Sequence, residues 1–336
     1  MKDVIKFIKT HVIASIIILI ITYIGINVIF YIRTPNPVVY MIRNNAFPIN
    51  VDKRNKQFVF DGNNKAYIDL EYPSEHTENK FDLFVPENPK KNNPTIIWVH
   101  GGGFVGGDKL SINDYGKRLA KEGYYFIAMN YELAPESKYP TPIIQLSELV
   151  KYLQTYKDHN INMNNLFLAG DSAGAQISAQ FATIQASASY SELTKINSVI
   201  NISKIKGVLL YSGVYDIKAM ATTNFLPLDY VYDKIGWSYL GNKDWKDSLE
   251  AVQINFLPYI NNNFPNTFIT DGNYVTYTDQ AKALVNLLEK QKVNVRPLFF
   301  SYNNIISHVY MFNLKTDAGK EALAKSLEFI EEYRLQ

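Results

Sequence analysis

Strands and helices are expected to alternate along most of this chain, and this alternation limits its fold more than any other feature. Thr95–Val99 is a continuous apolar run, typical of a strand that is buried on both faces. Asn165–Ala169 is a second strand pattern, and it leads directly into a helical one. Strands that alternate with helices are typical of a sheet covered by helices. The sequence therefore predicts an α/β fold.

Eight segments of the chain have the pattern of a strand. The first two alternate like antiparallel strands, whereas buried apolar runs of the kind found in parallel sheets follow. In chain order the eight segments are 66–71, 80–85, 95–99, 124–129, 165–169, 205–211, 267–270 and 295–300. Helices are expected after Ser172 and over 141–156, 278–289 and 318–333. We therefore expect a mostly parallel eight-stranded sheet with helices on both faces, in a domain that covers 66–336.

The alternation breaks between the strand that ends at Tyr211 and the strand that begins at Thr267. The intervening stretch is rich in Trp and Tyr, lacks strand periodicity and is bracketed by Pro227 and Pro258. We interpret it as a small helical cap, inserted over 214–262. The segment 34–65 is expected to be a linker that contributes to this cap.

The N-terminal segment Val12–Ile32 contains no charged residue. A helix over it would be roughly 30 Å long, enough to span a bilayer. A cleaved signal peptide is disfavoured because small residues are missing near its end, and a core helix would be amphipathic. We expect 1–33 to be an uncleaved transmembrane signal-anchor. Its flanking charges show a modest bias, with Lys2, Lys6, Lys9 and the amino terminus before the span and Arg33 and Arg43 after it. This bias favours an inside N-terminus and an external domain at the cell membrane.

The composition excludes several kinds of chemistry. The net charge is +2, with 34 basic and 32 acidic residues, and no basic run suggests nucleic-acid binding. The chain has no cysteine, which excludes disulfides and thiolate chemistry. No metal-binding or dinucleotide-binding motif is found, so we expect no metal and no cofactor. Small-molecule chemistry is favoured, and the oligomeric state stays open.

The motif Gly170–Gly174, with the sequence GDSAG, follows a predicted strand and opens a predicted helix. Such a G-x-S-x-G turn is sharp and exposes its serine hydroxyl, so Ser172 is a candidate nucleophile. Asp171 beside it is expected to shape the turn. The alternative is a tight glycine turn with a helix-capping serine.

A second glycine motif, His100–Phe104 (HGGGF), directly follows the strand 95–99. Glycines leave backbone N–H groups unobstructed, which suits an oxyanion hole formed by Gly102, Gly103 and Ala173. A phosphate-binding loop is the alternative, but no Lys-Ser or Lys-Thr pair follows.

A serine nucleophile needs a base, and the candidates are five histidines, His11, His76, His100, His159 and His308. Of these, only His308 follows Ser172, in the loop before the last helix, which matches the order serine, acid, histidine. A histidine in a surface loop is the alternative interpretation.

These motifs, together with Tyr131–Glu136 (YELAPE), resemble α/β hydrolases of the hormone-sensitive lipase-like esterase family. The resemblance runs from about Lys80 to the C-terminus, and Tyr211–Asp216 is also similar to kynurenine formamidase-like and feruloyl-esterase-like relatives. It implies an α/β hydrolase fold and a serine esterase that cleaves carboxylic esters of short to medium acyl chains. Deacylation of polysaccharides, of feruloyl esters or of amides is an alternative function. A catalytically silent interaction domain is a second alternative.

The sequence departs from this family at the acid. The family carries an Asp in a stretch resembling Tyr-Asp-Pro-Leu, and an ungapped match places Tyr274 at that position. Asp271 is our first candidate, because it ends a predicted strand and Gly272 lets the chain turn. Asp279 is the second candidate, although an Asp that begins a helix is more often a helix-terminus charge.

Overall fold

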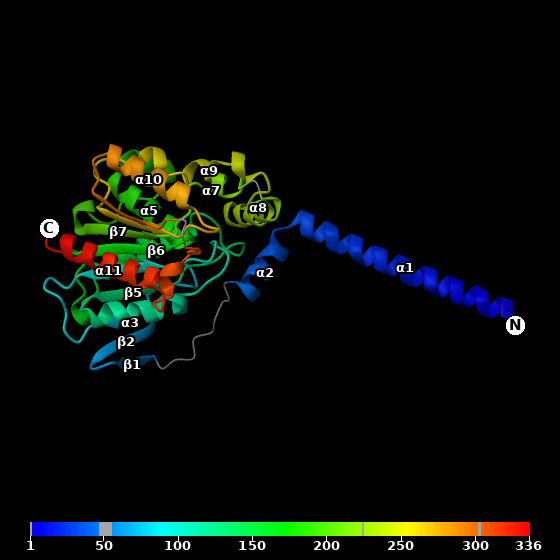
Figure 1. Ribbon diagram of the computed structural model, residues 1–336, viewed down its shortest axis with the longest axis horizontal. Coiled ribbons are helices and arrows are strands. Elements are labelled where there is room, and N and C mark those ends of the chain that lie inside the picture. Colours follow the sequence, from blue (N-terminus) through cyan, green and yellow to red (C-terminus); the bar gives the residue numbers. More distant parts are fainter. Residues whose placement is uncertain (1, 47–55, 224, 302–303) are drawn as a thin grey trace.

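The computed structural model of this chain describes residues 2–46, 56–223, 225–301 and 304–336. Within these residues a nine-stranded sheet forms the centre, in the order β1-β2-β3-β5-β4-β6-β7-β8-β9 (Figure 1). The strands are β1 Gln57–Phe60, β2 Asn64–Glu71, β3 Lys80–Val85, β4 Thr95–Val99, β5 Tyr125–Met129, β6 Leu166–Asp171, β7 Ile205–Tyr211, β8 Thr267–Asp271 and β9 Val295–Phe299. From β5 to β9 every neighbouring pair is parallel, so the carboxyl ends of these strands meet at one edge.

The expected number of eight strands was one too low, although each of the eight segments forms a strand. The additional strand is β1, which pairs with β2 alone at the edge of the sheet. It has four residues, of which only Phe58 and Phe60 are partly buried. An edge strand this short buries too little apolar surface to produce a clear sequence pattern.

Helices cover both faces of the sheet, as expected. Two separate clusters of buried apolar side chains lie on its two sides. One face carries α4 (Thr141–Leu153), α5 (Ala173–Ala186) and α10 (Thr278–Lys290), and the other carries α3 (Asn113–Lys121) and α11 (Asp317–Tyr333). The edge of the sheet at which the parallel strands end is therefore held between two clusters of buried apolar side chains. The candidate active site lies at this edge.

Among the described residues, three α-helices lie between β7 and β8, namely α7 (Ile217–Met220), α8 (Leu226–Leu240) and α9 (Leu249–Gln253). On α8, Tyr239 stacks on Phe104 of the HGGGF motif, with ring centroids 4.0 Å apart. The short helix α2 (Asn36–Asn45) packs against α8. The cap boundaries drawn from the sequence stay a prediction, whereas the contacts place α8 beside the glycine loop.

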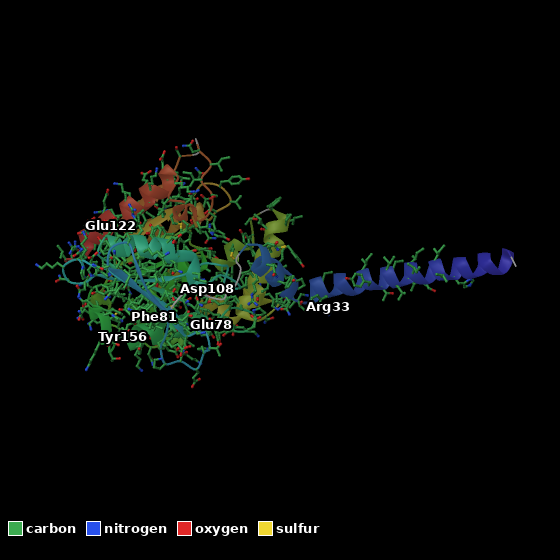
Figure 2. The ribbon with its side chains drawn as sticks, turned by 90° about the horizontal axis from the view of Figure 1, so that it is seen from below. Arg33, Glu78, Phe81, Asp108, Glu122 and Tyr156 are labelled. Carbon is green, nitrogen blue, oxygen red and sulfur yellow. The ribbon has the colours of Figure 1, made fainter. Side chains whose placement is uncertain are left out.

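The chain begins with one long helix, α1 (Lys2–Arg33), which leads away from the sheet domain in both views (Figures 1 and 2). Many of its described apolar side chains, among them Ile18, Leu19 and Ile21, are exposed. Across the described residues, no helix reaches both the length and the apolarity required for a membrane crossing. The transmembrane anchor expected over 1–33 is therefore not supported by the structure.

Candidate active site

Ser172 lies in a sharp turn between β6 and α5. Its backbone has φ 50° and ψ −116°, a combination that costs a non-glycine residue energy and persists only where the surroundings enforce it. The flanking glycines are required by packing. A Cβ at Gly170 would lie 2.4 Å from the carbonyl carbon of Gly174, and a Cβ at Gly174 would lie 2.0 Å from the carbonyl oxygen of Val99. The GDSAG motif therefore forms the strained turn that its spacing predicts.

The His308 side chain contacts this serine although the two residues are 136 positions apart in the sequence. Its Nε2 lies 3.0 Å from Ser172 Oγ, and its ring is nearly perpendicular to the Tyr277 ring, with centroids 5.5 Å apart. The residue after it, Val309, has φ 52° and donates its N–H to Ser212 Oγ at 3.1 Å. Burial lowers the pKa of His308 to about 4, so the imidazole is neutral near pH 7. A neutral imidazole in hydrogen-bond contact with a hydroxyl can act as a general base.

The HGGGF loop lies beside the turn. Gly102 has φ 128°, and a Cβ there would lie 2.0 Å from the carbonyl oxygen of Gly106, so no other residue fits. The N–H groups of Gly102 and Gly103 take part in no backbone hydrogen bond among the described residues. These donors, with the N–H of Ala173 at the start of α5, suit the stabilisation of a negatively charged oxygen.

Tyr131 supports this loop from behind. Its hydroxyl donates to the carbonyl of His100 at 3.0 Å, and its ring stacks on the His100 ring with centroids 4.3 Å apart. A further contact joins the two motifs, because the N–H of Ala134 donates to the carbonyl of Phe104 at 2.9 Å. The YELAPE motif is therefore a buttress for the glycine loop.

Asp171 is buried under the same turn. It accepts a hydrogen bond from Trp98 Nε1 at 2.9 Å, and burial raises its pKa to about 6. A Cβ at Gly101 would lie 2.3 Å from its carboxylate. This carboxylate thus holds the end of β4 against the end of β6 and shapes the turn.

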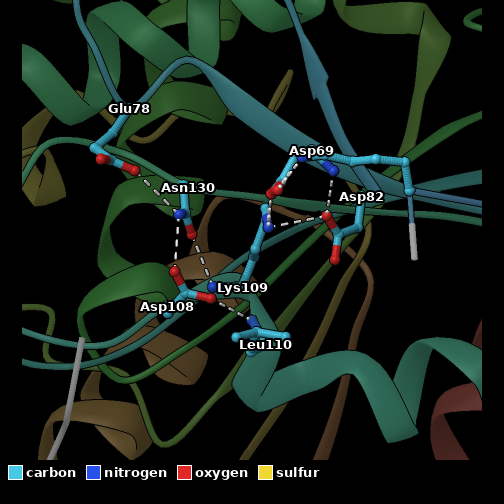
Figure 3. Close-up of polar contacts among 8 residues, drawn as sticks. Asp69, Glu78, Asp82, Asp108, Lys109, Leu110 and Asn130 are labelled. Carbon is cyan, nitrogen blue, oxygen red and sulfur yellow. Dashed lines mark hydrogen bonds and ion pairs between the residues drawn. The ribbon is translucent and has the colours of Figure 1, made fainter. Parts of the chain in front are cut away.

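A buried polar cluster secures the segment that follows the glycine loop (Figure 3). Lys109 Nζ lies 2.6 Å from Asp69 and 3.0 Å from Asp82, both on the antiparallel strands. Burial acts to lower the pKa of Lys109, but the two carboxylates raise it above its ordinary value. The backbone N–H of Lys109 donates to Asn130 Oδ1 at 2.8 Å, and Asn130 Nδ2 donates to Asp108 at 2.9 Å. This cluster ties the glycine loop to the sheet.

The two acid candidates lie in different environments. Asp271 is completely buried at the end of β8, whereas Asp279 is exposed in the first turn of α10. Burial raises the pKa of Asp271 to about 6, although hydrogen bonds from Thr276, Ser212 and the backbone limit the rise. Tyr274, at the position where the family carries its acid, is 56% exposed. Asp271 thus lies in a buried, hydrogen-bonded position at the end of β8, whereas Asp279 lies at the surface.

Between Asp271 and His308 lies Thr276, a residue that the sequence analysis did not identify. Its hydroxyl donates to Asp271 Oδ1 and lies 3.2 Å from His308 Nδ1. No sequence signal marks a lone Thr in a loop as part of a site, because its position depends on how the loop folds. Within the described residues, no group of three or more His, Asp and Glu side chains is arranged to hold a metal ion.

Comparison with known proteins identifies a family for this chain. The family model BD-FAE matches residues 81–288, which include both glycine motifs and Asp271 and end before His308.

Solved structures with the same fold include esterase B from Lactobacillus rhamnosis, with a TM-score of 0.72 and 19% identity over 90% of this chain and 96% of that one. An esterase from the bacterial hormone-sensitive lipase family has a TM-score of 0.63 and 20% identity, over 89% and 98% of the two chains. A bacterial heroin esterase has a TM-score of 0.63 and 18% identity, over 88% of each chain. These similarities establish the α/β hydrolase fold, and the chain belongs to the BD-FAE family.

Proposed function

We propose that this protein is a serine hydrolase that cleaves carboxylic esters. The observation that carries the proposal is the 3.0 Å contact between Ser172 Oγ and His308 Nε2, beside a loop of free backbone donors. The strained backbone of Ser172 supports it further, because such strain is concentrated at functional sites. The same contact favours a working enzyme over a catalytically silent interaction domain.

The reaction follows from the positions of these groups. Ser172 Oγ attacks the acyl carbon while its proton passes to His308 Nε2, and the carbonyl oxygen takes on negative charge. The N–H groups of Gly102, Gly103 and Ala173 stabilise that charge. His308 then returns the proton to the departing alcohol, which leaves an acyl group on Ser172. A water molecule, deprotonated by the same imidazole, attacks the acyl group and restores the serine.

Asp271 is the acid of this proposed triad. Its negative charge stabilises the imidazolium that forms when His308 accepts the proton. It is completely buried, so its charge is not screened by solvent. The link to His308 is indirect, because the Thr276 hydroxyl lies between the two residues.

The proposed substrates are small-molecule esters with short to medium acyl chains. Helix α8 supports a limit on size, because its Ile235 packs directly over the glycine loop, 3.4 Å from where a Cβ of Gly103 would lie. Esterase B, a protein of the same fold, is described in one structure as inhibited by a tributyrin phosphonate. Rates over aryl esters of increasing acyl length should peak at short or medium length. A maximum on feruloyl esters, acetylated polysaccharide or amides would favour the alternative activities instead.

The first experiment is active-site labelling with a fluorophosphonate probe. The native protein should be labelled and should hydrolyse an aryl acetate, whereas heat-denatured protein and Ser172→Ala should do neither. His308→Ala should lose turnover by a factor of about 10³ or more while the fold is retained. Full activity in Ser172→Ala would overturn the proposal.

Location is a separate proposal. We propose that the N-terminal segment holds the protein at the cell membrane with the hydrolase domain outside, as the flanking lysines suggest. The exposed apolar side chains along α1 support an apolar environment for this helix. After cell lysis the protein should sediment with membranes, and carbonate extraction should distinguish a firmly inserted helix from a surface contact. Protease added to intact cells should release the domain, and recovery in the soluble fraction would contradict the proposal.

A further inference from the structure

The carboxylate of Asp271 is enclosed by its own turn. Its Oδ1 accepts from the backbone N–H of Gly272 at 2.8 Å and from the hydroxyl of Thr276, and its Oδ2 accepts from the N–H of Tyr277 at 3.0 Å. The loop 271–277 therefore wraps around this carboxylate. These three partners lie within six residues of Asp271, and the Ser212 side chain is a further hydrogen-bond partner from the end of β7.

The hydroxyl of Thr276 is the group that faces His308. Its Oγ1 lies 3.2 Å from His308 Nδ1 and has a single proton, which it donates to Asp271 Oδ1. The hydroxyl oxygen must therefore accept a hydrogen bond from the N–H at Nδ1. This fixes the tautomer with the proton on Nδ1 and leaves a lone pair on Nε2, where Ser172 Oγ lies.

The backbone of this loop is shaped to bring Thr276 to that position. Val275 has φ 48°, in the left-handed region that a β-branched residue rarely adopts. Its side chain and that of Tyr274 are both more than half exposed. Tyr274, which occupies the position of the family's acid, is thus largely exposed to solvent. Thr276 is the residue of this loop that contacts the histidine.

We propose that Thr276 is a positioning residue that connects Asp271 to His308, so that the working arrangement is Ser172, His308, Thr276 and Asp271 in series. This inference rests on the proposed function, because it assigns a role within that reaction. Relative to the family pattern, in which the acid lies at the position of Tyr274, the carboxylate lies at the end of β8. The Thr276 hydroxyl fills the distance between this carboxylate and His308. The hydrogen-bond path from Asp271 to the imidazole then runs through this hydroxyl.

Replacement of Thr276 tests this directly, with hydrolysis of an aryl acetate as the assay. Thr276→Val keeps the branched shape and removes the hydroxyl, and it should lower kcat by about 10²-fold with KM changed by less than about threefold. Thr276→Ser restores the hydroxyl and should recover kcat to within about threefold of the native enzyme. Thr278→Val is the matched control, because the Thr278 hydroxyl donates to the carbonyl of Gly272 and contacts neither partner. This control should change kcat by less than about threefold.

A double-mutant cycle with Asp271→Asn identifies the path. If Asp271 acts through Thr276, the variant with both Asp271→Asn and Thr276→Val should be no slower than the slower single variant. If the reductions in kcat of the two single variants multiply in the double variant, the inference is wrong. Native kcat in Thr276→Val would also overturn it, and so would a reduction in Thr276→Ser or Thr278→Val as large as that in Thr276→Val.

These outcomes are distinct from a failure of the proposed function. If Ser172→Ala abolishes labelling and turnover while Thr276→Val remains fully active, the proposed esterase function is supported and the arrangement in series is wrong. If the native enzyme neither hydrolyses the ester nor reacts with the fluorophosphonate probe, the proposed function fails and the inference with it.

Discussion

Ser172 and its glycine loop are positioned by close contacts of the backbone, whereas His308 and Asp271 are connected through a side-chain hydroxyl. On the nucleophile side, Gly102 and Gly174 leave no room for a Cβ, so the residue types are dictated by contact with main-chain atoms. On the histidine side, Thr276 joins Asp271 to His308 through a single hydroxyl. Residues on the nucleophile side can therefore change little, because main-chain atoms leave no room for other side chains. On the histidine side the acid can occupy a different position, provided that another group connects it to the imidazole.

The strongest way to break this contrast is Gly102→Ala. The added methyl group would meet the carbonyl oxygen of Gly106 at 2.0 Å, and φ 128° is unfavourable for alanine. The loop must shift, and the loss of oxyanion donors should lower kcat by about 10³-fold. Gly25→Ala is the matched control, since a Cβ there meets nothing within 4 Å. Activity near the native level in Gly102→Ala would mean that the backbone on this side is not limiting.

The acid side should respond less strongly. Asp271→Asn removes the charge behind Thr276 and keeps most of the hydrogen bonds, so kcat should fall by about 10²-fold. Asp279→Asn, at the exposed start of α10, should leave kcat unchanged within about twofold. Steady-state kinetics on the two variants decides between the candidates, and the reverse ranking would make Asp279 the acid.

The pH dependence of kcat/KM sharpens the comparison, because both titrating groups belong to the side-chain half. Burial lowers the pKa of His308 to about 4 and raises the pKa of Asp271 to about 6. The base is lost as pH falls through the lowered histidine pKa, and the supporting charge is lost as pH falls through the raised aspartate pKa. We expect a plateau from pH 8 to about 6.5 and a loss of about tenfold or more by pH 4. A midpoint above pH 7 would contradict the burial of His308.

The smallest effect is expected for Tyr131→Phe. The variant keeps the stacked ring and removes the hydroxyl that donates to the carbonyl of His100. The loss of one buried hydrogen bond is worth about 1 kcal/mol, which corresponds to roughly a fivefold effect on kcat if all of it reaches the oxyanion loop. The midpoint temperature of thermal unfolding should fall by only a few degrees. An effect as large as that of Gly102→Ala would show that the loop depends on its buttress as much as on its glycines.

At the edge strand and the N-terminal helix, the sequence patterns and the described structure differ. β1 was missed because its four residues bury only part of two aromatic side chains. The apolar run in α1 suggested a transmembrane span, which the described structure does not support. By contrast, the eight recognised strands carry buried apolar runs or strict alternation, and such patterns depend on local burial alone.

The sequence by itself determined the α/β order, the nucleophile turn and the glycine loop, because each depends on residue types at fixed short spacing. It also singled out His308 by elimination among five histidines. The positions of Asp271 beside Thr276, and of Thr276 beside His308, appear only in the folded structure. Thr276 lies five residues from Asp271 and far along the chain from His308, and no local pattern encodes the loop that brings the three together. A hydroxyl becomes a link between a carboxylate and an imidazole only when folding places it between them, and that placement is set by contacts distant in sequence.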